Sequence, residues 1–72
     1  MSELVSRLRE ARSERGWTQA ELAERVGVTR KTVNTVENGV FTPSTTLALK
    51  LARALETSVE ALFQLAEDGR SG

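Results

Sequence analysis

Two residue types that carry much of protein chemistry are missing from this sequence of 72 residues, which contains no cysteine and no histidine. Without cysteine there is no disulfide and no thiolate nucleophile, and without both residues the usual zinc-binding sets are excluded. The commonest general base is absent as well. We therefore expect no metal site and no cofactor, and the absence of cysteine fits a reducing compartment such as the cytoplasm.

Long apolar segments are also missing. The start of the chain lacks the apolar region of a secretion signal, and no run approaches the roughly 20 apolar residues of a membrane-spanning helix. There is no glycine-rich phosphate loop and no paired arrangement of acidic residues, and a chain of this length leaves little room for an ordinary ligand pocket. These absences predict a cytoplasmic protein without membrane contact, catalytic residues or an evident small-molecule effector.

The charges that are present balance, with 10 basic and 10 acidic residues, but they are unevenly distributed. From residue 25 to residue 36 the charged side chains are those of Arg25, Arg30 and Lys31, and none is acidic. From residue 55 to residue 68 all the charged side chains are acidic. A neutral protein with this polarity can still set a basic face against phosphate groups.

Scarce aromatic residues and abundant helix formers predict an all-α domain over residues 1–66, followed by a short tail over 67–72. Apolar residues at three- and four-residue spacing indicate five helices. Their expected ranges are 3–14, 18–26, 29–38, 43–55 and 58–63, with Leu65 and Ala66 as an extension of the last helix. Leu4, Val5 and Leu8 belong to the expected inward stripe of the first helix.

Cap and turn residues mark the ends of the second helix. Thr18 and Glu21 form a capping box, in which each side chain binds the backbone N–H group of the other residue. Trp17 before the cap and Leu22 after it form the matching hydrophobic staple, which favours a packing role for Trp17 over stacking on a nucleic acid. Gly27 ends this helix in a turn that is expected to need a positive φ.

Residues 18–38 carry the motif from which a function can be inferred. Ala23 is small enough to lie where two helices cross, Gly27 follows four residues later in the turn, and Val33 follows six residues after that as a buried anchor. This spacing is typical of a helix-turn-helix unit, whose second helix enters the major groove of DNA.

Around this unit the chain resembles the lambda-repressor-like, Cro and XRE family of transcriptional regulators, most closely its short stand-alone members. The matching segments are RLREARSERGWTQAELAERVGVTRKTVNTVENG and PSTTLALKLARALETSVEALF. The resemblance extends from about Leu4 to Phe63. It implies a compact five-helix domain that binds double-stranded DNA with the helix over 29–38 in the major groove.

The outward face of this expected recognition helix holds the candidate base-contacting residues Arg30, Lys31, Asn34 and Thr35. Arginine can donate two hydrogen bonds to guanine, asparagine can pair with adenine N6 and N7, and threonine can touch a thymine methyl group. Two cations at a helix N-terminus oppose the helix dipole, so stability alone would not select them. A merely solvated polar face is the alternative interpretation, above all for Thr35.

Five further residues are candidates for contact with DNA phosphates: Thr18, Gln19, Thr29, Thr32 and Asn38. The resemblance places Gln19 where its amide and the helix N-terminus contact phosphate. Thr18 and Thr29 are also the expected N-caps of the second and third helices, and Thr32 could simply reinforce the helix start. Asn38 could equally serve only to end the third helix.

Arg12 and Glu37 are expected to have a structural role. Arg12 falls on the inward stripe of the first helix, and Glu37 lies at the end of the third. The resemblance implies a buried ion pair between them. Removing one partner would leave a lone buried charge, at a cost on the order of 3–5 kcal/mol.

A homodimer is expected because one recognition helix reads too few base pairs for useful specificity in a genome. Two copies on half-sites about 34 Å apart multiply the information. We therefore expect a repressor that binds a (pseudo)palindromic operator as a homodimer. Phe63 and Leu65 are the candidate dimer interface, because Leu65 lies off the apolar stripe of the last helix.

Two other functions fit the sequence. The chain could be an antitoxin or operon controller that acts with a protein partner, although an antitoxin usually needs a further toxin-binding segment. It could also be a helical protein-interaction module that has lost DNA binding, for which the zero net charge is the best support. This last alternative predicts that Arg30 and Lys31 can become alanine without loss of function.

Overall fold

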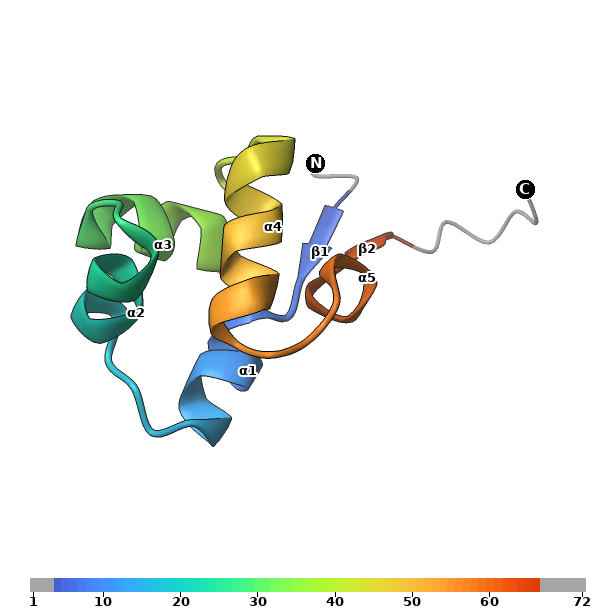
Figure 1. Cartoon of the computed structure of the whole chain (residues 1–72). Coiled ribbons are helices and arrows are strands. Elements are labelled where there is room, and N and C mark those ends of the chain that lie inside the picture. The colour runs from blue at the N-terminus through green and yellow to red at the C-terminus, as the bar shows by residue number, and fades with distance from the viewer. Residues whose placement is uncertain (1–3, 67–72) are drawn as a thin grey trace.

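The structure is a computed structural model of the chain, and it describes residues 4–66. Its elements, in chain order, are β1 (Leu4–Ser6), α1 (Leu8–Glu14), α2 (Gln19–Val26), α3 (Arg30–Glu37), α4 (Thr45–Ala54), α5 (Val59–Leu62) and β2 (Phe63–Leu65). α4 stands in the centre, with α2 and α3 on one side of it and β1, α5 and β2 on the other (Figure 1). The five helices expected from the sequence are present, and α2 and α3 form the helix-turn-helix unit.

Polar side chains cap the starts of four helices, as expected for Thr18 and Thr29. Thr18 Oγ1 accepts the N–H of Glu21 at 3.0 Å, while Glu21 Oε1 accepts the N–H of Thr18 at 2.8 Å, which completes the capping box. The side chains of Thr29, Ser44 and Ser58 cap α3, α4 and α5 in a similar way. Because each cap satisfies a backbone N–H that the helix itself cannot pair, these local residues determine where the helices start.

The turn between α2 and α3 depends on Gly27, whose φ of 85° lies in the left-handed region. A Cβ on this residue would meet no atom within 4 Å, so the need for glycine is conformational and not steric. The carbonyl of Ala23, which is 3% exposed, accepts the N–H groups of Gly27 at 2.8 Å and of Val28 at 3.0 Å. The short turn thus holds α3 close against α2.

Both ends of the described chain differ from the sequence-based prediction. The helix expected over 3–14 begins only at Leu8, and residues 4–6 form a strand; residue 3 lies outside the described residues. The expected helical extension through Leu65 and Ala66 is likewise wrong, because residues 63–65 form β2 and Ala66 belongs to no element. The two strands are antiparallel and pair Leu4 with Leu65, Val5 with Gln64 and Ser6 with Phe63.

The physical reason for this difference is that the strands complete each other across the fold. A helix of about 12 residues is marginal in water by itself, so tertiary partners decide the conformation. Leu4 packs against the core whereas Val5 is 38% exposed, which is the alternation of a strand and not the stripe of a helix. Ser6 Oγ then accepts the N–H of Leu8 at 3.3 Å, at the point where α1 begins.

One apolar core joins all the helices. Its buried members are Leu8, Leu22, Ala23, Val26, Val33, Val36, Ala48, Leu51, Ala52, Leu55, Leu62 and Phe63. Ala23, expected where two helices cross, and Val33, expected as a buried anchor, are both among them. Within residues 4–66 no helix has the length and apolar character needed to span a membrane.

Candidate nucleic-acid interface

α3 has one buried face and one exposed polar face. Val33 and Val36 are each 1% exposed and anchor the helix in the core. On the opposite face Arg30, Lys31 and Asn34 are exposed and together line one shallow hollow of the surface. The helical spacing of these three residues therefore brings them together as the sequence predicts.

Arg30 and Lys31 carry positive charges that the domain does not neutralise. The first turn of α3 holds no acidic residue, and neither cation forms an ion pair within residues 4–66. Their charges also oppose the dipole of α3. This arrangement costs the isolated domain stability, and it is favourable where an anion or a guanine edge faces the helix.

The threonines of α3 are tied into the start of the helix. Thr29 Oγ1 accepts the N–H of Thr32 at 3.1 Å and lies 2.9 Å from Thr32 Oγ1. Thr35 is half-buried, and its hydroxyl donates to the carbonyl of Thr32 at 3.0 Å. Because the hydrogen of the Thr35 hydroxyl is used inside the helix, this side chain has only oxygen lone pairs and its methyl group left to offer to a ligand.

Arg12 and Glu37 form the ion pair that the resemblance implies. Arg12 Nε donates to Glu37 Oε2 at 2.6 Å, and Arg12 Nη2 donates to Glu37 Oε1 at 3.2 Å. The Arg12 side chain is 14% exposed and the Glu37 side chain 0%. The third nitrogen of the guanidinium, Nη1, donates to the carbonyl of Trp17 at 2.7 Å. One side chain of α1 thus connects α3 with Trp17, the residue before the N-cap of α2.

The donors around Glu37 overcome the cost of its burial. Burial favours the uncharged carboxyl, but the hydrogen bonds from Arg12, Gln19 and Arg9 and the charge of Arg12 together lower the pKa of Glu37 below its usual value. The hydrogen bond to Glu37 in turn raises the pKa of Arg12. The pair is therefore ionised in the folded protein at neutral pH.

Gln19 also contacts this buried carboxylate, which the sequence does not indicate. Its Nε2 donates to Glu37 Oε1 at 3.0 Å and to Asn34 Oδ1 at 3.2 Å. Both hydrogens of the amide are therefore used inside the domain. A phosphate contact from Gln19 then depends on its backbone N–H, which lies in the first turn of α2.

Arg9 is a second participant that sequence reasoning missed. Its Nη2 donates to Asn38 Oδ1 at 2.8 Å, and its Nε lies 3.5 Å from Glu37 Oε1. Asn38, expected as a phosphate contact, donates its Nδ2 to Asn34 Oδ1 at 3.2 Å. The signal that could have found Arg9 is its position three residues before Arg12, which places the two on one face of a helix.

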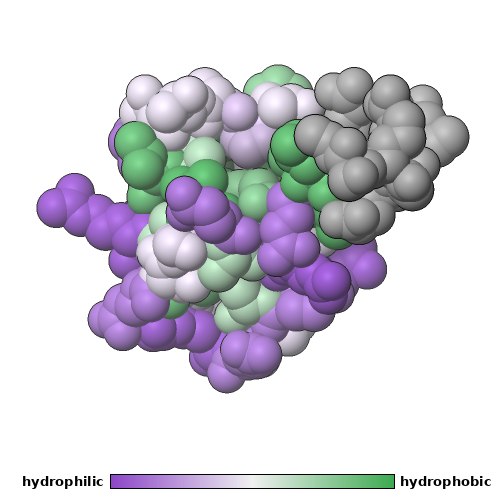
Figure 2. All heavy atoms as spheres, turned by 90° about the vertical axis from the view of Figure 1, so that its right-hand side faces the viewer, coloured by the Kyte–Doolittle hydropathy of each residue, from purple (hydrophilic) through white to green (hydrophobic). Residues whose placement is uncertain are grey.

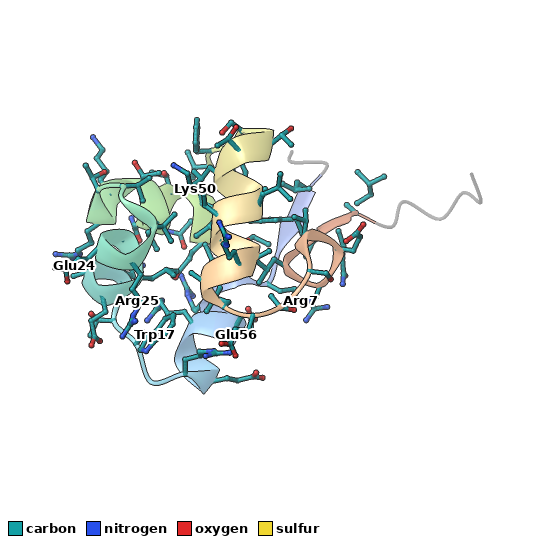
Figure 3. The ribbon with its side chains drawn as sticks, in the orientation of Figure 1. Arg7, Trp17, Glu24, Arg25, Lys50 and Glu56 are labelled. Carbon is teal, nitrogen blue, oxygen red and sulfur yellow. The ribbon has the colours of Figure 1, made fainter. Side chains whose placement is uncertain are left out.

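Trp17 has the packing role expected for it. It packs against the core while half-buried, and the Arg25 guanidinium lies 4.1 Å from the centre of its ring. Figure 3 shows Trp17 and Arg25 beside each other between α1 and α2. The Arg15 guanidinium lies 5.5 Å from the same ring. The indole is thus covered by two cations.

The fold and the exposed face of α3 together define a helix-turn-helix DNA-binding domain. A helix-turn-helix family model matches residues 8–62, which is most of the chain. The chain therefore belongs to this family, of the lambda-repressor-like, Cro and XRE type, and it is a transcriptional regulator of a class that does not contain enzymes.

Two relatives illustrate the range of the family. An uncharacterized HTH-type transcriptional regulator from Methanothermobacter thermautotrophicus is 54% identical over 63 residues, which cover 86% of this chain and 91% of the relative. The antitoxin HipB from Escherichia coli O6:H1 is 33% identical over 58 residues, which cover 81% of this chain and 62% of HipB.

Solved structures of known regulators have the same fold. The restriction-modification controller protein C.AhdI from Aeromonas hydrophila superposes with a TM-score of 0.71 at 41% identity, over 75% of this chain and 82% of that chain. SinR, the master regulator for biofilm formation, in its complex with DNA, superposes with a TM-score of 0.70 at 31% identity, over 75% of this chain and 87% of the chain in that structure.

Proposed function

We propose that this regulator is a repressor that binds a (pseudo)palindromic operator as a homodimer, with α3 of each copy in the major groove. The observation that carries the proposal is the face of α3 on which Arg30 and Lys31 stand exposed and unneutralised beside Asn34. The similarity to SinR, which has been crystallised with DNA, supports it. Such a face destabilises the free domain slightly, and its positive charges become stabilising when they contact DNA.

The residues divide between reading bases and holding the backbone. Arg30 donates two hydrogen bonds from its guanidinium to guanine O6 and N7, and Lys31 neutralises a phosphate or donates a hydrogen bond to a neighbouring guanine. Thr35 offers its methyl group to a thymine. The N-terminal ends of α2 and α3 receive phosphates. Gln19 contributes its backbone N–H, whereas Thr18, Thr29 and Thr32 contribute their hydroxyl groups, because the caps already bind the N–H groups of Thr18 and Thr32.

The second copy covers the apolar face on the side of α4 away from α3. A groove of about 730 Å³ opens there, lined mainly by apolar side chains of β1, α4 and α5 such as Leu4, Leu49 and Val59. Leu49 is 58% exposed and Leu65 78%. In Figure 2, which views this side, apolar residues form a band with hydrophilic residues below it. Burying such surface favours association, against the cost of the freedom that the two copies lose.

Of the two residues expected at the dimer interface, Phe63 is buried within the single chain. Phe63 is 8% exposed and belongs to the core of the single chain, so little of it remains to contact a partner. Phe63 instead lines the groove from the core side, where a partner can pack over it. Leu65 keeps the role expected for it.

DNA binding is tested by selecting bound fragments from genomic DNA and then measuring fluorescence anisotropy near physiological salt. The selected duplex should bind on the order of 10³ times more tightly than a scrambled duplex. Arg30→Ala should remove most of this preference. Arg7→Ala, which removes the same charge at the far side of the domain near α5 (Figure 3), is the matched control and should keep it. Equal binding to all duplexes, or an Arg30→Ala variant that keeps full preference, favours a protein-interaction module instead.

The dimer is tested by light scattering. Leu65→Glu places a charge on the proposed interface and should halve the measured mass. Gln64→Glu introduces the same side chain at the neighbouring residue of β2, which points to the other face of the strand, and should leave the mass unchanged. An unchanged mass for Leu65→Glu, or a monomeric parent protein, removes the proposed interface.

A second candidate function is that of an operon controller that acts with a protein partner. The similarity to the controller protein C.AhdI and to the antitoxin HipB favours it. The chain spans 62% of HipB, so it matches only part of that antitoxin. Operator affinity measured with and without the product of the adjoining gene separates the two candidates, because the stand-alone repressor needs no partner.

A further inference from the structure

Three side-chain amides meet at the surface where α2 and α3 touch, and we call Gln19, Asn34 and Asn38 the amide cluster. An amide has a donor end and an acceptor end, so the end that points outward decides whether it donates a hydrogen bond to a ligand or accepts one. In this cluster two charged neighbours determine the orientation of the amides, Glu37 at one end and Arg9 at the other. A carboxylate only accepts hydrogen bonds and a guanidinium only donates them.

Glu37 sets the orientation from the side of α2. Its buried carboxylate can only accept, so the amide of Gln19 must turn its Nε2 inward, where it donates to Glu37 Oε1 at 3.0 Å. The second hydrogen of Nε2 then needs an acceptor, and Asn34 Oδ1 provides it at 3.2 Å. The orientation of Gln19 therefore requires Asn34 to turn its oxygen toward α2.

Arg9 sets the same orientation from the side of α1. Its guanidinium can only donate, so Asn38 must turn its Oδ1 toward Arg9, where the distance to Nη2 is 2.8 Å. This leaves Nδ2 of Asn38 to face the preceding turn of α3, and it donates to Asn34 Oδ1 at 3.2 Å. Both lines of hydrogen bonds thus end on the same oxygen, and both lone pairs of Asn34 Oδ1 are used.

We propose that Asn34 reads its base pair as a pure hydrogen-bond donor and selects guanine over adenine. This inference rests on the proposed binding of α3 in the major groove. Asn34 Nδ2 donates to no group within residues 4–66 and belongs to the exposed face shared with Arg30 and Lys31. Turning its oxygen toward DNA would break two hydrogen bonds of the amide cluster.

The selectivity follows from the edges that bases present in the major groove. Guanine offers two acceptors, N7 and O6, whereas adenine offers one acceptor, N7, next to the donor N6. An asparagine that is free to turn pairs with adenine through both ends of its amide. Asn34 has only its donor end available, so the adenine pairing that its residue type suggests is lost and guanine becomes the favoured partner.

The orientation is measured first without DNA, by proton exchange of the side-chain amides in ¹⁵N NMR spectra. The NH₂ hydrogens of Gln19 should exchange slowly because both are bonded, and those of Asn34 should exchange at the rate of a free amide. The reverse pattern overturns the inference whatever the DNA result is. This measurement therefore remains informative even where the proposed function fails.

Base preference is measured next, by selecting bound duplexes from a randomised library. The base pair at which Asn34→Ala loses preference is the one that Asn34 reads, and the parent protein should prefer guanine over adenine there by at least about fivefold, the lower end for one good base contact. Replacing that guanine by 7-deazaguanine should weaken binding of the parent but not of Asn34→Ala.

The double variant Gln19→Ala/Asn38→Ala tests the cause. It frees Asn34 Oδ1, so the preference at this base pair should move toward adenine, while the base pair read by Arg30 serves as the internal control and keeps its preference. Thermal melts confirm that the variant is folded. An adenine preference in the parent protein, an unchanged preference in the double variant, or an Asn34→Ala variant with no lost position each overturns the inference while leaving the proposed function standing.

Discussion

Replacing Arg12 by alanine should cost much of the stability of this domain. The change removes donors at 2.6 Å and 3.2 Å from a Glu37 carboxylate whose side chain is 0% exposed. Breaking a buried pair by removing one partner costs about 3–5 kcal/mol. Gln19 and Arg9 still donate to Oε1, which places the expected loss near the lower value. At about 0.05–0.15 kcal/mol for each residue, a chain of this size has only about 4–11 kcal/mol in total.

The assay is urea denaturation followed by far-UV circular dichroism. Fluorescence of Trp17 is a poorer probe, because Arg12 Nη1 is bonded to the carbonyl of that residue and the variant changes its surroundings directly. Glu56→Ala is the matched control. It breaks the ion pair of Glu56 with Arg15, which has an N–O distance of 3.0 Å but side chains 77% and 35% exposed. Its cost should stay below about 1 kcal/mol.

A double variant, Arg12→Met/Glu37→Met, completes the test. Removing both charges leaves no unpaired buried charge, although the carbonyl of Trp17 and Nε2 of Gln19 each lose one partner, so this variant should recover much of the stability that Arg12→Ala loses. The reasoning is refuted if Arg12→Ala costs no more than Glu56→Ala, or if the double variant is as unstable as the single one. The first result would mean that water reaches Glu37, and the second that shape and not charge holds the site together.

Three further predictions concern the backbone and the response to acid. Gly27→Ala should lose about 1–2 kcal/mol in denaturant titrations because of its positive φ, and Gly27→Asn should lose less; equal losses would contradict the conformational explanation. Glu56→Gly should raise the melting temperature by a few degrees, because Glu56 has a φ of 55° after the end of α4, a backbone conformation that favours glycine. A lower melting temperature would show that the ion pair of Glu56 contributes more to stability than the strained backbone costs. The pKa values of Glu37 and Glu21 are lowered on folding, so their contribution to stability is complete above about pH 4.5 and is lost as the pH falls through the lowered values. In thermal melts between pH 7 and 3, Glu37→Gln should therefore lose less stability on acidification than the parent protein. An equal loss in both proteins would contradict this explanation.

The helix-turn-helix unit could be predicted from the sequence because its determinants are local. Thr18 binds a residue three positions away, and Gly27 acts through its own φ. Arg30, Lys31 and Asn34 share a face because of the helical period alone. Such features need no knowledge of the tertiary structure.

The strands and the amide cluster could not be predicted, because they depend on partners far away in the chain. β1 is extended only because β2 lies beside it, and nothing within residues 4–6 indicates that neighbour. The direction in which the Asn34 amide points depends in the same way on Arg9 of α1. Residue type shows that asparagine can read DNA, but only the hydrogen bonds around it show which end it reads with.

The pairing of β1 with β2 has a consequence for the chain as an object to be engineered. It brings the first and last described residues next to each other, on the side of α4 away from α3 (Figure 1). A short linker from residue 66 to residue 4 could therefore close the described part of the chain into a loop. New ends opened in the exposed segment between α3 and α4 would leave every helix intact. Cargo fused there would stand close to α3, whereas cargo joined at residue 4 or residue 66 would be attached on the far side of α4.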